Sequence, residues 1–354
     1  MKEPGKRRFR FWFAVVAAPV MIWLLGVAAW TWWAEEHPGR ERELRVELHD
    51  LLREQFPEQM RLPDDRLGFI SRGDTGDGEQ HPDVILIHGL DEPGDIWDDL
   101  VPALAAEGIA AWEFRYPNDH AIDLSVDLLA ERWSTLPGDA PVVLVGHSMG
   151  GLVIRDFVSR LRHPVEGESA VEGPPVRGGI LVGTPNHGSE LARLRVWLGL
   201  REFVGQAKEE DFSLFAPLRS GTGAAKIDLR PGSQFLTELN ERPWPGAVPL
   251  RVIGGMLGEP DPDLLDTVGG IATELGTEEM PRQFESWWRE LGEGVGDGVV
   301  PVSSLSLADA PPPMLVPASH RGMLVRSSSD KEIPPAIPHV LEILEEWGHP
   351  ARDE

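Results

Sequence analysis

The sequence predicts an open α/β fold, with a mostly parallel central sheet and helices on both of its faces. From about residue 81, short runs rich in β-branched residues alternate with longer segments of helical periodicity, which is the order of elements in such folds. The short runs are continuously apolar, as strands buried on both faces are. The length of 354 residues is enough for a substantial buried core.

The expected elements follow one another without an internal repeat. Strands are expected over residues 83–87, 109–114, 142–145, 179–182, 250–253 and 314–316. Helices are expected over residues 96–106, 122–136, 152–161 and 336–347. The stretch 64–82 is rich in Gly and Asp, which predicts a loop. We expect these strands and helices to form one domain over residues 81–350.

The amino terminus has the pattern of a membrane anchor. Residues 1–10 carry five basic side chains against a single acid, and residues 11–33 carry no charged side chain. A helix over 11–33 would be about 35 Å long, enough to cross a bilayer core of about 30 Å. We therefore expect a cytoplasmic basic flank at 1–10, a transmembrane signal anchor at 11–33, and the rest of the chain outside the cytoplasm, periplasmic or extracellular.

A cleaved signal peptide is the alternative for this segment. Val27, Ala28 and Ala29 form a stretch of small residues that resembles a cleavage site. The retained anchor is favoured because the apolar run is longer than a typical signal-peptide core. In the alternative, the body of the protein is secreted.

Residues 34–80 predict an amphipathic helix followed by a linker. Apolar side chains recur at helical spacing among Arg and Glu, namely Leu44, Leu48, Leu51, Leu52 and Phe56. The helix is expected to end near Pro57 and to serve as a stalk or to lie on the main domain.

The composition excludes several classes of function. Asp and Glu number 58 against 33 Lys and Arg, for a net charge of −25, which argues against a nucleic-acid partner because phosphate binding needs clustered cations. The chain has no cysteine, which excludes disulfides, thiol nucleophiles and zinc ribbons.

One motif between a predicted strand and a predicted helix carries chemistry. Gly146, Ser148 and Gly150 form a Gly-x-Ser-x-Gly pattern directly after the strand 142–145. Glycine is needed on both sides because larger side chains would clash in so tight a turn. The turn lifts the serine hydroxyl above the carboxyl edge of the sheet and leaves the Met149 amide at the start of a helix, where it attracts negative charge. An ordinary Gly-rich turn is the alternative, which the downstream partners disfavour.

With this motif the chain resembles the α/β-hydrolase superfamily, and within it the bacterial lipases and esterases, including relatives similar to GPI inositol-deacylases. The resemblance extends over residues 83–347, and the segments 85–90, 183–189 and 228–236 also carry it. It implies that a serine, an acid and a histidine, in this chain order, form a catalytic triad.

The resemblance also implies how the transition state is stabilised. The backbone amides of Leu90 and Met149 are expected to form the oxyanion hole. His88 and Gly89 shape the loop before Leu90. His147 is expected to shape the turn at Ser148 without titrating in the reaction.

His320 is the histidine expected to act as the base. It follows the predicted strand 314–316 in a loop at the carboxyl edge of the sheet. His339 opens the last helix, where capping or packing is favoured, and His349 lies in the polar tail.

Asp297 is the carboxylate expected to orient that base. It stands between Gly296 and Gly298, before a Val-Val-Pro run that would fix it by packing, and the segment resembles the lipase pattern around the triad acid. The rival acids are Asp261, Asp263, Asp266 and Asp309.

Two long insertions are candidates for a cap over the site. Residues 190–230 are too many for an ordinary connection and contain an apolar stripe, which indicates either a helix packed on the sheet or a lid. Residues 257–291 form a second insertion with Phe284, Trp287 and Trp288. An apolar cap beside a membrane anchor favours hydrophobic, lipid-like acyl esters as substrates.

The expected activity is hydrolysis of carboxylic esters through an acyl-enzyme, with neither a metal nor an organic cofactor required. An acyltransferase on the same fold and an inactive hydrolase-like scaffold are the alternatives. The pattern of residues indicates no oligomeric state.

Overall fold

A computed structural model of the chain describes residues 21, 25–27, 29–63, 66–72, 81–90, 92, 94–190, 216–256, 294–326 and 332–348. Most of the predicted membrane anchor at 11–33 lies outside these residues, as do the insertion 257–291 and residues 191–215 of the candidate lid. Among the residues described, no helix is both long enough and apolar enough to span a bilayer.

A sheet of seven strands forms the centre of the described structure, in the order β1-β3-β2-β4-β5-β6-β7. The strands are β1 (Gly68–Arg72), β2 (Val84–Ile87), β3 (Ala111–Arg115), β4 (Val142–His147), β5 (Val176–Val182), β6 (Leu250–Met256) and β7 (Met314–Pro317). All neighbouring strands from β3 to β7 are parallel, and β1 is antiparallel to β3. The mostly parallel sheet expected from the sequence is confirmed.

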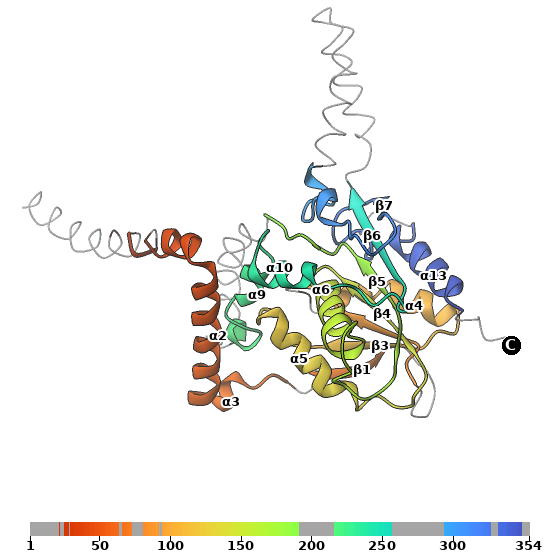
Figure 1. The fold of residues 1–354 in the computed structure, drawn as a ribbon, viewed down its shortest axis with the longest axis horizontal. Helices are drawn as coiled ribbons and strands as arrows, with labels where there is room; N and C mark the ends of the chain where they lie inside the picture. Colours follow the sequence, from red (N-terminus) through yellow and green to blue (C-terminus); the bar gives the residue numbers. More distant parts are fainter. Residues whose placement is uncertain are drawn as a thin grey trace, which may run out of the picture.

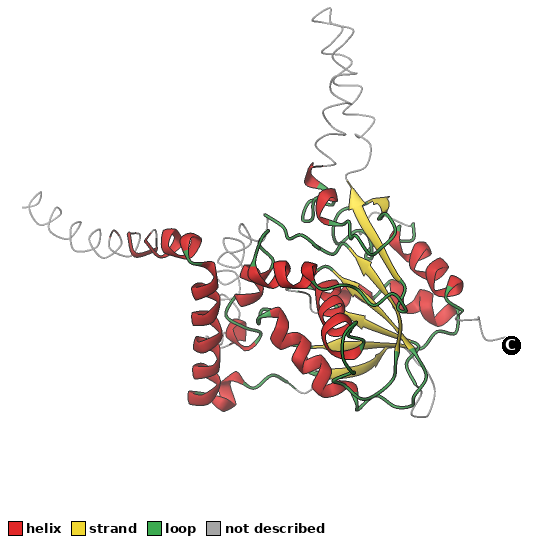
Figure 2. Cartoon of the chain, in the orientation of Figure 1, coloured by secondary structure: helices red, strands yellow, loops and turns green. Residues whose placement is uncertain are grey.

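Helices cover both faces of this sheet (Figures 1 and 2). One face carries α5 (Ile122–Trp133), α6 (Met149–Asp156) and α10 (Gln234–Glu241), and the other carries α4 (Leu100–Ala106) and α13 (Ala336–Glu346). The shorter elements are α3 (Pro57–Met60), α8 (Ala216–Arg219), α9 (Ala224–Asp228), the 3-10 turns Asp95–Trp97 and Val302–Ser304, and the π-helical turn Phe157–Arg162.

Burial on both faces explains the continuous apolar runs. In β2, Ile85 and Ile87 pack against the helices of the first face, while Val84 and Leu86 pack against those of the second. All four side chains are fully buried. Because both faces of such a strand are buried, its sequence does not alternate between polar and apolar residues.

One prediction for this region is wrong. Residues 68–72, expected to lie in a loop, form the edge strand β1. Phe69 holds the strand in place because its ring packs 5.2 Å from the ring of Phe114 and 6.2 Å from that of Trp133. The strand is short and half-buried, so its sequence lacks the long apolar run that identified the inner strands.

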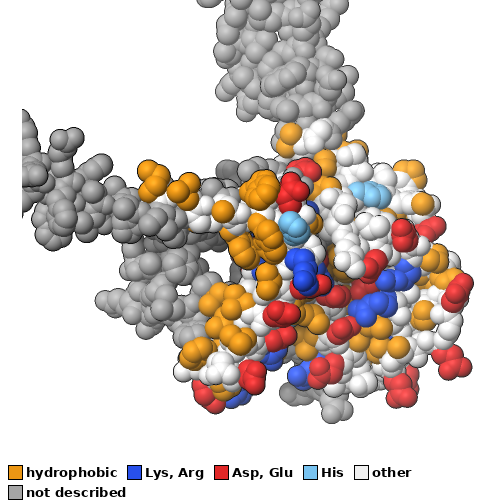
Figure 3. Space-filling view, turned by 60° about the vertical axis from the view of Figure 1, so that its left-hand side comes forward, with side chains coloured by type: hydrophobic (Ala, Val, Ile, Leu, Met, Phe, Trp, Pro, Cys, Tyr) orange, Lys and Arg blue, Asp and Glu red, His pale blue; other side chains and the backbone are white. Residues whose placement is uncertain are grey.

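The predicted helix before the domain is confirmed as α2 (Pro38–Gln55), which lies against α9. Its inward side is polar, since Glu41 and His49 are each only 2% exposed. Three of its four leucines point outward, with Leu44 44%, Leu48 49% and Leu51 55% exposed. Figure 3 looks toward this side of the molecule, where hydrophobic side chains form an interrupted band.

Charged contacts therefore hold α2 on the domain. Arg42 donates to Asp123 and to Asp228, each over 2.6 Å. Asp228 is 1% exposed and also accepts the Ile122 amide over 2.9 Å. Burial raises the pKa of Asp228 to about 6, against the opposing effect of the Arg42 charge, so the carboxylate depends on its partners to stay ionised.

Candidate active site

Ser148 occupies the turn between β4 and α6 with φ 55° and ψ −125°. Among the described residues it is the only non-glycine with a positive φ, a conformation that costs energy and concentrates at functional sites. The flanking glycines make the turn feasible. A Cβ at Gly146 would lie 2.6 Å from the Gly151 nitrogen, and one at Gly150 would collide with the Ile87 carbonyl.

Asp297 and His320, 23 residues apart, are in direct contact. His320 Nδ1 lies 2.7 Å from Asp297 Oδ2. The other carboxylate oxygen accepts the amides of Val299 and Val300 over 2.8 and 2.7 Å. Because a carboxylate only accepts, Nδ1 carries the proton and Nε2 is left as a proton acceptor.

The unprotonated nitrogen of His320 is buried and has no hydrogen-bond partner in the described part of the chain. The Ser148 hydroxyl likewise makes no hydrogen bond there, so none joins it to His320. The two residues are nevertheless connected through His147, whose ring lies 4.7 Å from that of His320 and whose Nε2 is 3.1 Å from the His320 carbonyl. An unpaired basic nitrogen in this position is suited to take a proton, and such contacts often tighten only when substrate binds.

The loop after β2 lies directly against Ser148. A Cβ at Gly89 would stand 2.8 Å from the Ser148 Cβ, so only glycine permits this approach. The Leu90 amide, next in the chain, donates no hydrogen bond to any described residue. The Met149 amide begins α6, where helix geometry offers it no acceptor. Both amides are therefore available to an anion.

His88 holds this loop as a neutral ring. Its Nδ1–H donates to the Gly89 carbonyl over 3.0 Å. Burial lowers the pKa of His88 to about 4, so the ring carries no charge near neutral pH.

Two residues that support the loop were missed by sequence reasoning. The Tyr116 hydroxyl donates to the His88 carbonyl over 2.6 Å, and its ring stacks 4.6 Å from that of His88. Asn118 donates to the carbonyls of Gly89 and Glu92, each over 3.3 Å. Their position in the sequence could have indicated this role, since both lie within three residues of the end of β3, the strand that pairs with β2. Tyr116 is also the only tyrosine in the sequence.

The rival residues lie elsewhere or outside the described residues. Asp309 accepts the Trp244 amide over 3.2 Å. His339 lies within α13, 3.5 Å from Glu342. The residues outside the described part are Asp261, Asp263, Asp266 and His349.

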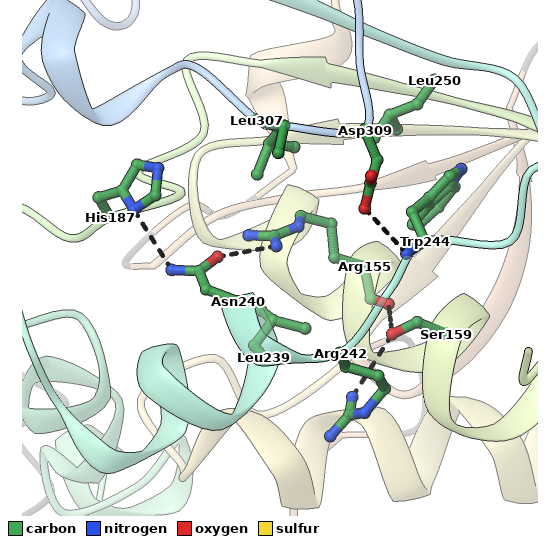
Figure 4. Close-up of a pocket in the computed structure, with 11 residues that line it drawn as sticks. Arg155, Ser159, His187, Leu239, Asn240, Arg242, Trp244, Leu250, Leu307 and Asp309 are labelled. Carbon is green, nitrogen blue, oxygen red and sulfur yellow. Dashed lines mark hydrogen bonds between the residues drawn. The ribbon is translucent and has the colours of Figure 1, made fainter.

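Figure 4 shows a cavity of about 100 Å³ that contains none of the three predicted triad residues. Its polar groups largely bond one another. Arg155 donates to Asn240 over 2.8 Å, and Asn240 lies 3.4 Å from His187 Nδ1. The cavity lies beside α6 and α10, and we assign it no ligand.

The chain matches known proteins over the region that carries these features. The family described as "Alpha/beta hydrolase family" matches residues 84–352. A curated relative, the pimeloyl-[acyl-carrier protein] methyl ester esterase of Aeromonas hydrophila subsp. hydrophila, is 27% identical in an alignment 284 residues long that covers 76% of this chain and 95% of the relative.

Solved structures of similar fold include two lipases. The mature lipase BlEst2 of Bacillus licheniformis is 17% identical, with a TM-score of 0.48, over 78% of this chain and 97% of that one. The Staphylococcus hyicus lipase is 14% identical, with a TM-score of 0.47, over 78% of this chain and 99% of that one.

Proposed function

This chain belongs to the α/β-hydrolase family, and we propose that it is a carboxylic ester hydrolase of the lipase and esterase type with Ser148, His320 and Asp297 as its catalytic triad. One observation carries the proposal. His320 is fixed by Asp297 through Nδ1, its Nε2 is buried with no partner among the described residues, and its ring lies 4.7 Å from that of His147, which directly precedes the strained residue Ser148. The similarity to a methyl ester esterase supports the same chemistry.

In the proposed reaction the Ser148 oxygen attacks the ester carbonyl carbon while His320 Nε2 takes the hydroxyl proton. Asp297 stabilises the imidazolium, and the amides of Leu90 and Met149 stabilise the oxyanion. When the C–O bond of the tetrahedral intermediate breaks, His320 protonates the leaving alcohol. Water then attacks the acyl-enzyme by the same route and releases the acid.

The proposed substrates are hydrophobic acyl esters reached at a membrane surface. The uncharged run 11–33 supports an anchor, and the exposed band on α2 supports a lipid-facing side, because Leu44, Leu48 and Leu51 point away from the domain. Under this proposal the hydrolase domain lies outside the cytoplasm, with secretion after cleavage near Ala29 as the alternative. Residues 190–230 and 257–291 would supply the apolar cap.

Labelling by a fluorophosphonate probe tests the chemistry. The wild type should be labelled covalently and Ser148→Ala should not, since the probe reacts only with an activated serine. Equal labelling of both proteins, or of neither, would refute the proposed nucleophile, and the latter would favour the inactive scaffold.

A profile of ester chain lengths then tests the substrate class. Turnover should rise with acyl length and above the solubility limit of the ester. Equal turnover of acetate and long-chain esters would contradict a lipid-like substrate. Product analysis with a lipid alcohol present separates hydrolysis, which releases free acid, from acyl transfer.

A further inference from the structure

Three potential metal ligands meet where α2 lies against the main domain, and none of them belongs to the proposed triad. His49 and Asp50 are adjacent on α2, and His120 lies in the segment between β3 and α5. We propose that these three side chains bind a divalent transition metal of the zinc type, which ties α2 to the domain. The inference is independent of the proposed function.

The ligand atoms already converge. His49 Nδ1 and His120 Nε2 are 2.9 Å apart, and one atom from each of the three residues lies within 4.8 Å of the others. Ligands on a tetrahedral zinc with bonds of about 2.1 Å stand about 3.4 Å apart. Small side-chain rotations are therefore enough to place an ion between the three groups, with water in the fourth position.

The residue types fit zinc better than a harder cation. Imidazole nitrogens suit zinc, copper and nickel, whereas calcium and magnesium prefer oxygen ligands. Asp50 is exposed, which gives an ion access.

The charges around the cluster are of both signs. The carboxylates of Asp50 and Asp123 favour a cation at this place, and the guanidinium of Arg53 opposes one. The alternative to a metal site is a hydrogen-bonded pair of histidines.

A metal here would secure a segment that supports the loop next to Ser148. The Asp119 amide donates to Ser220, and the Gly223 amide donates back to Asp119. One residue earlier in the chain, Asn118 holds the carbonyls of Gly89 and Glu92. The segment that contains His120 therefore connects the proposed metal site to the loop that contains Leu90.

Zinc titration of the full chain, without a polyhistidine tag and in detergent, tests the proposal. After chelator treatment and dialysis, calorimetry should show one zinc per chain, and zinc should raise Tm by about 3–6 °C at a hundredfold excess over Kd. Cobalt(II) in place of zinc should give the visible absorption of a four-coordinate site.

Asp50→Asn is the first variant, because this exposed side chain can change without affecting the core. It should weaken zinc binding at least tenfold and leave Tm without zinc unchanged. His49→Gln combined with His120→Gln should abolish binding, with circular dichroism to confirm folding. His339→Gln, which removes another histidine beside an acid, is the matched control and should bind zinc like the wild type.

Two results would overturn the inference. One is a wild type that binds zinc no more tightly than the double variant. The other is equal affinity in the Asp50→Asn, His339→Gln and wild-type proteins, which would indicate only scattered surface binding. Either result would leave the simple histidine pair as the explanation of the contact.

Discussion

The edge of the sheet around Ser148 and the contact between α2 and the domain are held by different interactions. At the sheet edge, glycines permit close backbone approach, and Asp297 is fixed by the amides of the two residues that follow it closely in the chain. At α2, one contact with a buried group is the ion pair from Arg42 to Asp228, 186 residues away in the chain. Local backbone geometry positions the candidate site, whereas long-range charge pairing positions the helix.

This difference matters for stability as well as for recognition of the site. Apolar burial on both faces stabilises the sheet whatever the partners of a single side chain are. In a buried ion pair, the attraction between the partners offsets the cost of removing each charge from water. When one partner is lost, the desolvation cost of the other is no longer offset, and the free energy of unfolding falls. We therefore expect changes at the sheet edge to affect turnover first and changes at α2 to affect folding first.

The largest effect is expected for Asp297→Asn. The asparagine amide carries no charge and cannot stabilise the imidazolium. It can also donate to His320 Nδ1, which places the ring proton on Nε2, where it prevents proton uptake from Ser148. We expect kcat to fall by about 10³–10⁴-fold with a nearly unchanged unfolding free energy. Ester hydrolysis followed with a chromogenic substrate measures the first quantity, and urea unfolding measures the second.

Asp309→Asn is the matched control for that variant. Asp309 is the rival acid nearest to His320 in the chain, and it bonds Trp244 instead. It should keep its activity within about twofold. Comparable losses in both variants would remove the distinction between the two carboxylates.

Arg42→Met should have the next largest effect, and on folding rather than on turnover. It leaves Asp228, 1% exposed, without its cation. Because Arg42 itself is partly exposed, we expect a loss of about 2–3 kcal/mol in the free energy of unfolding at pH 8. Adding Asp228→Asn should restore more than half of it, since the uncompensated charge is then gone.

Arg40→Met, on the same helix, gives the comparison. Arg40 pairs with Glu43 on the surface, with side chains 75% and 59% exposed. Its loss should change the unfolding free energy by no more than about 0.5 kcal/mol. If the two arginine variants unfold alike, charge pairing does not hold α2 in place.

The sequence predicted the site more fully than it predicted the position of α2. The turn at Ser148 was predictable because its glycines are required within two residues of the nucleophile. Asp297 and His320 followed from their segments and from chain order, and their contact agrees with the prediction. Their catalytic roles remain predictions.

The position of α2 could not be predicted for a physical reason. Helical spacing of Leu44, Leu48 and Leu51 indicates one apolar face, but not whether that face meets the domain. The side of α2 that faces the domain is set by the ion pairs of Arg42 with Asp123 and Asp228, which the spacing of the leucines does not reveal. Tyr116 and Asn118 could not be predicted for a related reason, because both bond backbone carbonyls of the loop after β2, which lie 26 to 29 residues away in the chain.

A smaller effect is expected from the pH dependence of folding at His88. The pKa of His88 is lowered to about 4 by burial, while in the unfolded chain it is about 6.5. The stability that the neutral ring contributes is therefore complete above pH 6.5 and is lost as the pH falls toward 4. At pH 4 the loss would be about 1–3 kcal/mol.

The variant His88→Gln isolates this contribution. Its free energy of unfolding should fall less steeply than that of the wild type between pH 6.5 and pH 4, with a constant difference at pH 7–8. Urea unfolding at a series of pH values measures both slopes. Parallel curves over the whole range would show that His88 takes up its proton equally well in the folded state.

Tyr116→Phe should have the smallest effect and tests whether local geometry at the sheet edge depends on a single hydrogen bond. The variant keeps the ring that stacks on His88 and leaves the buried His88 carbonyl without its donor. We expect a loss of about 1–1.5 kcal/mol in unfolding free energy. A several-fold fall in kcat with KM unchanged would follow if the Leu90 amide shifts, since the oxyanion forms only after substrate is bound. A fall in stability with an unchanged kcat would mean that Tyr116 supports the fold at this edge without positioning the oxyanion donor.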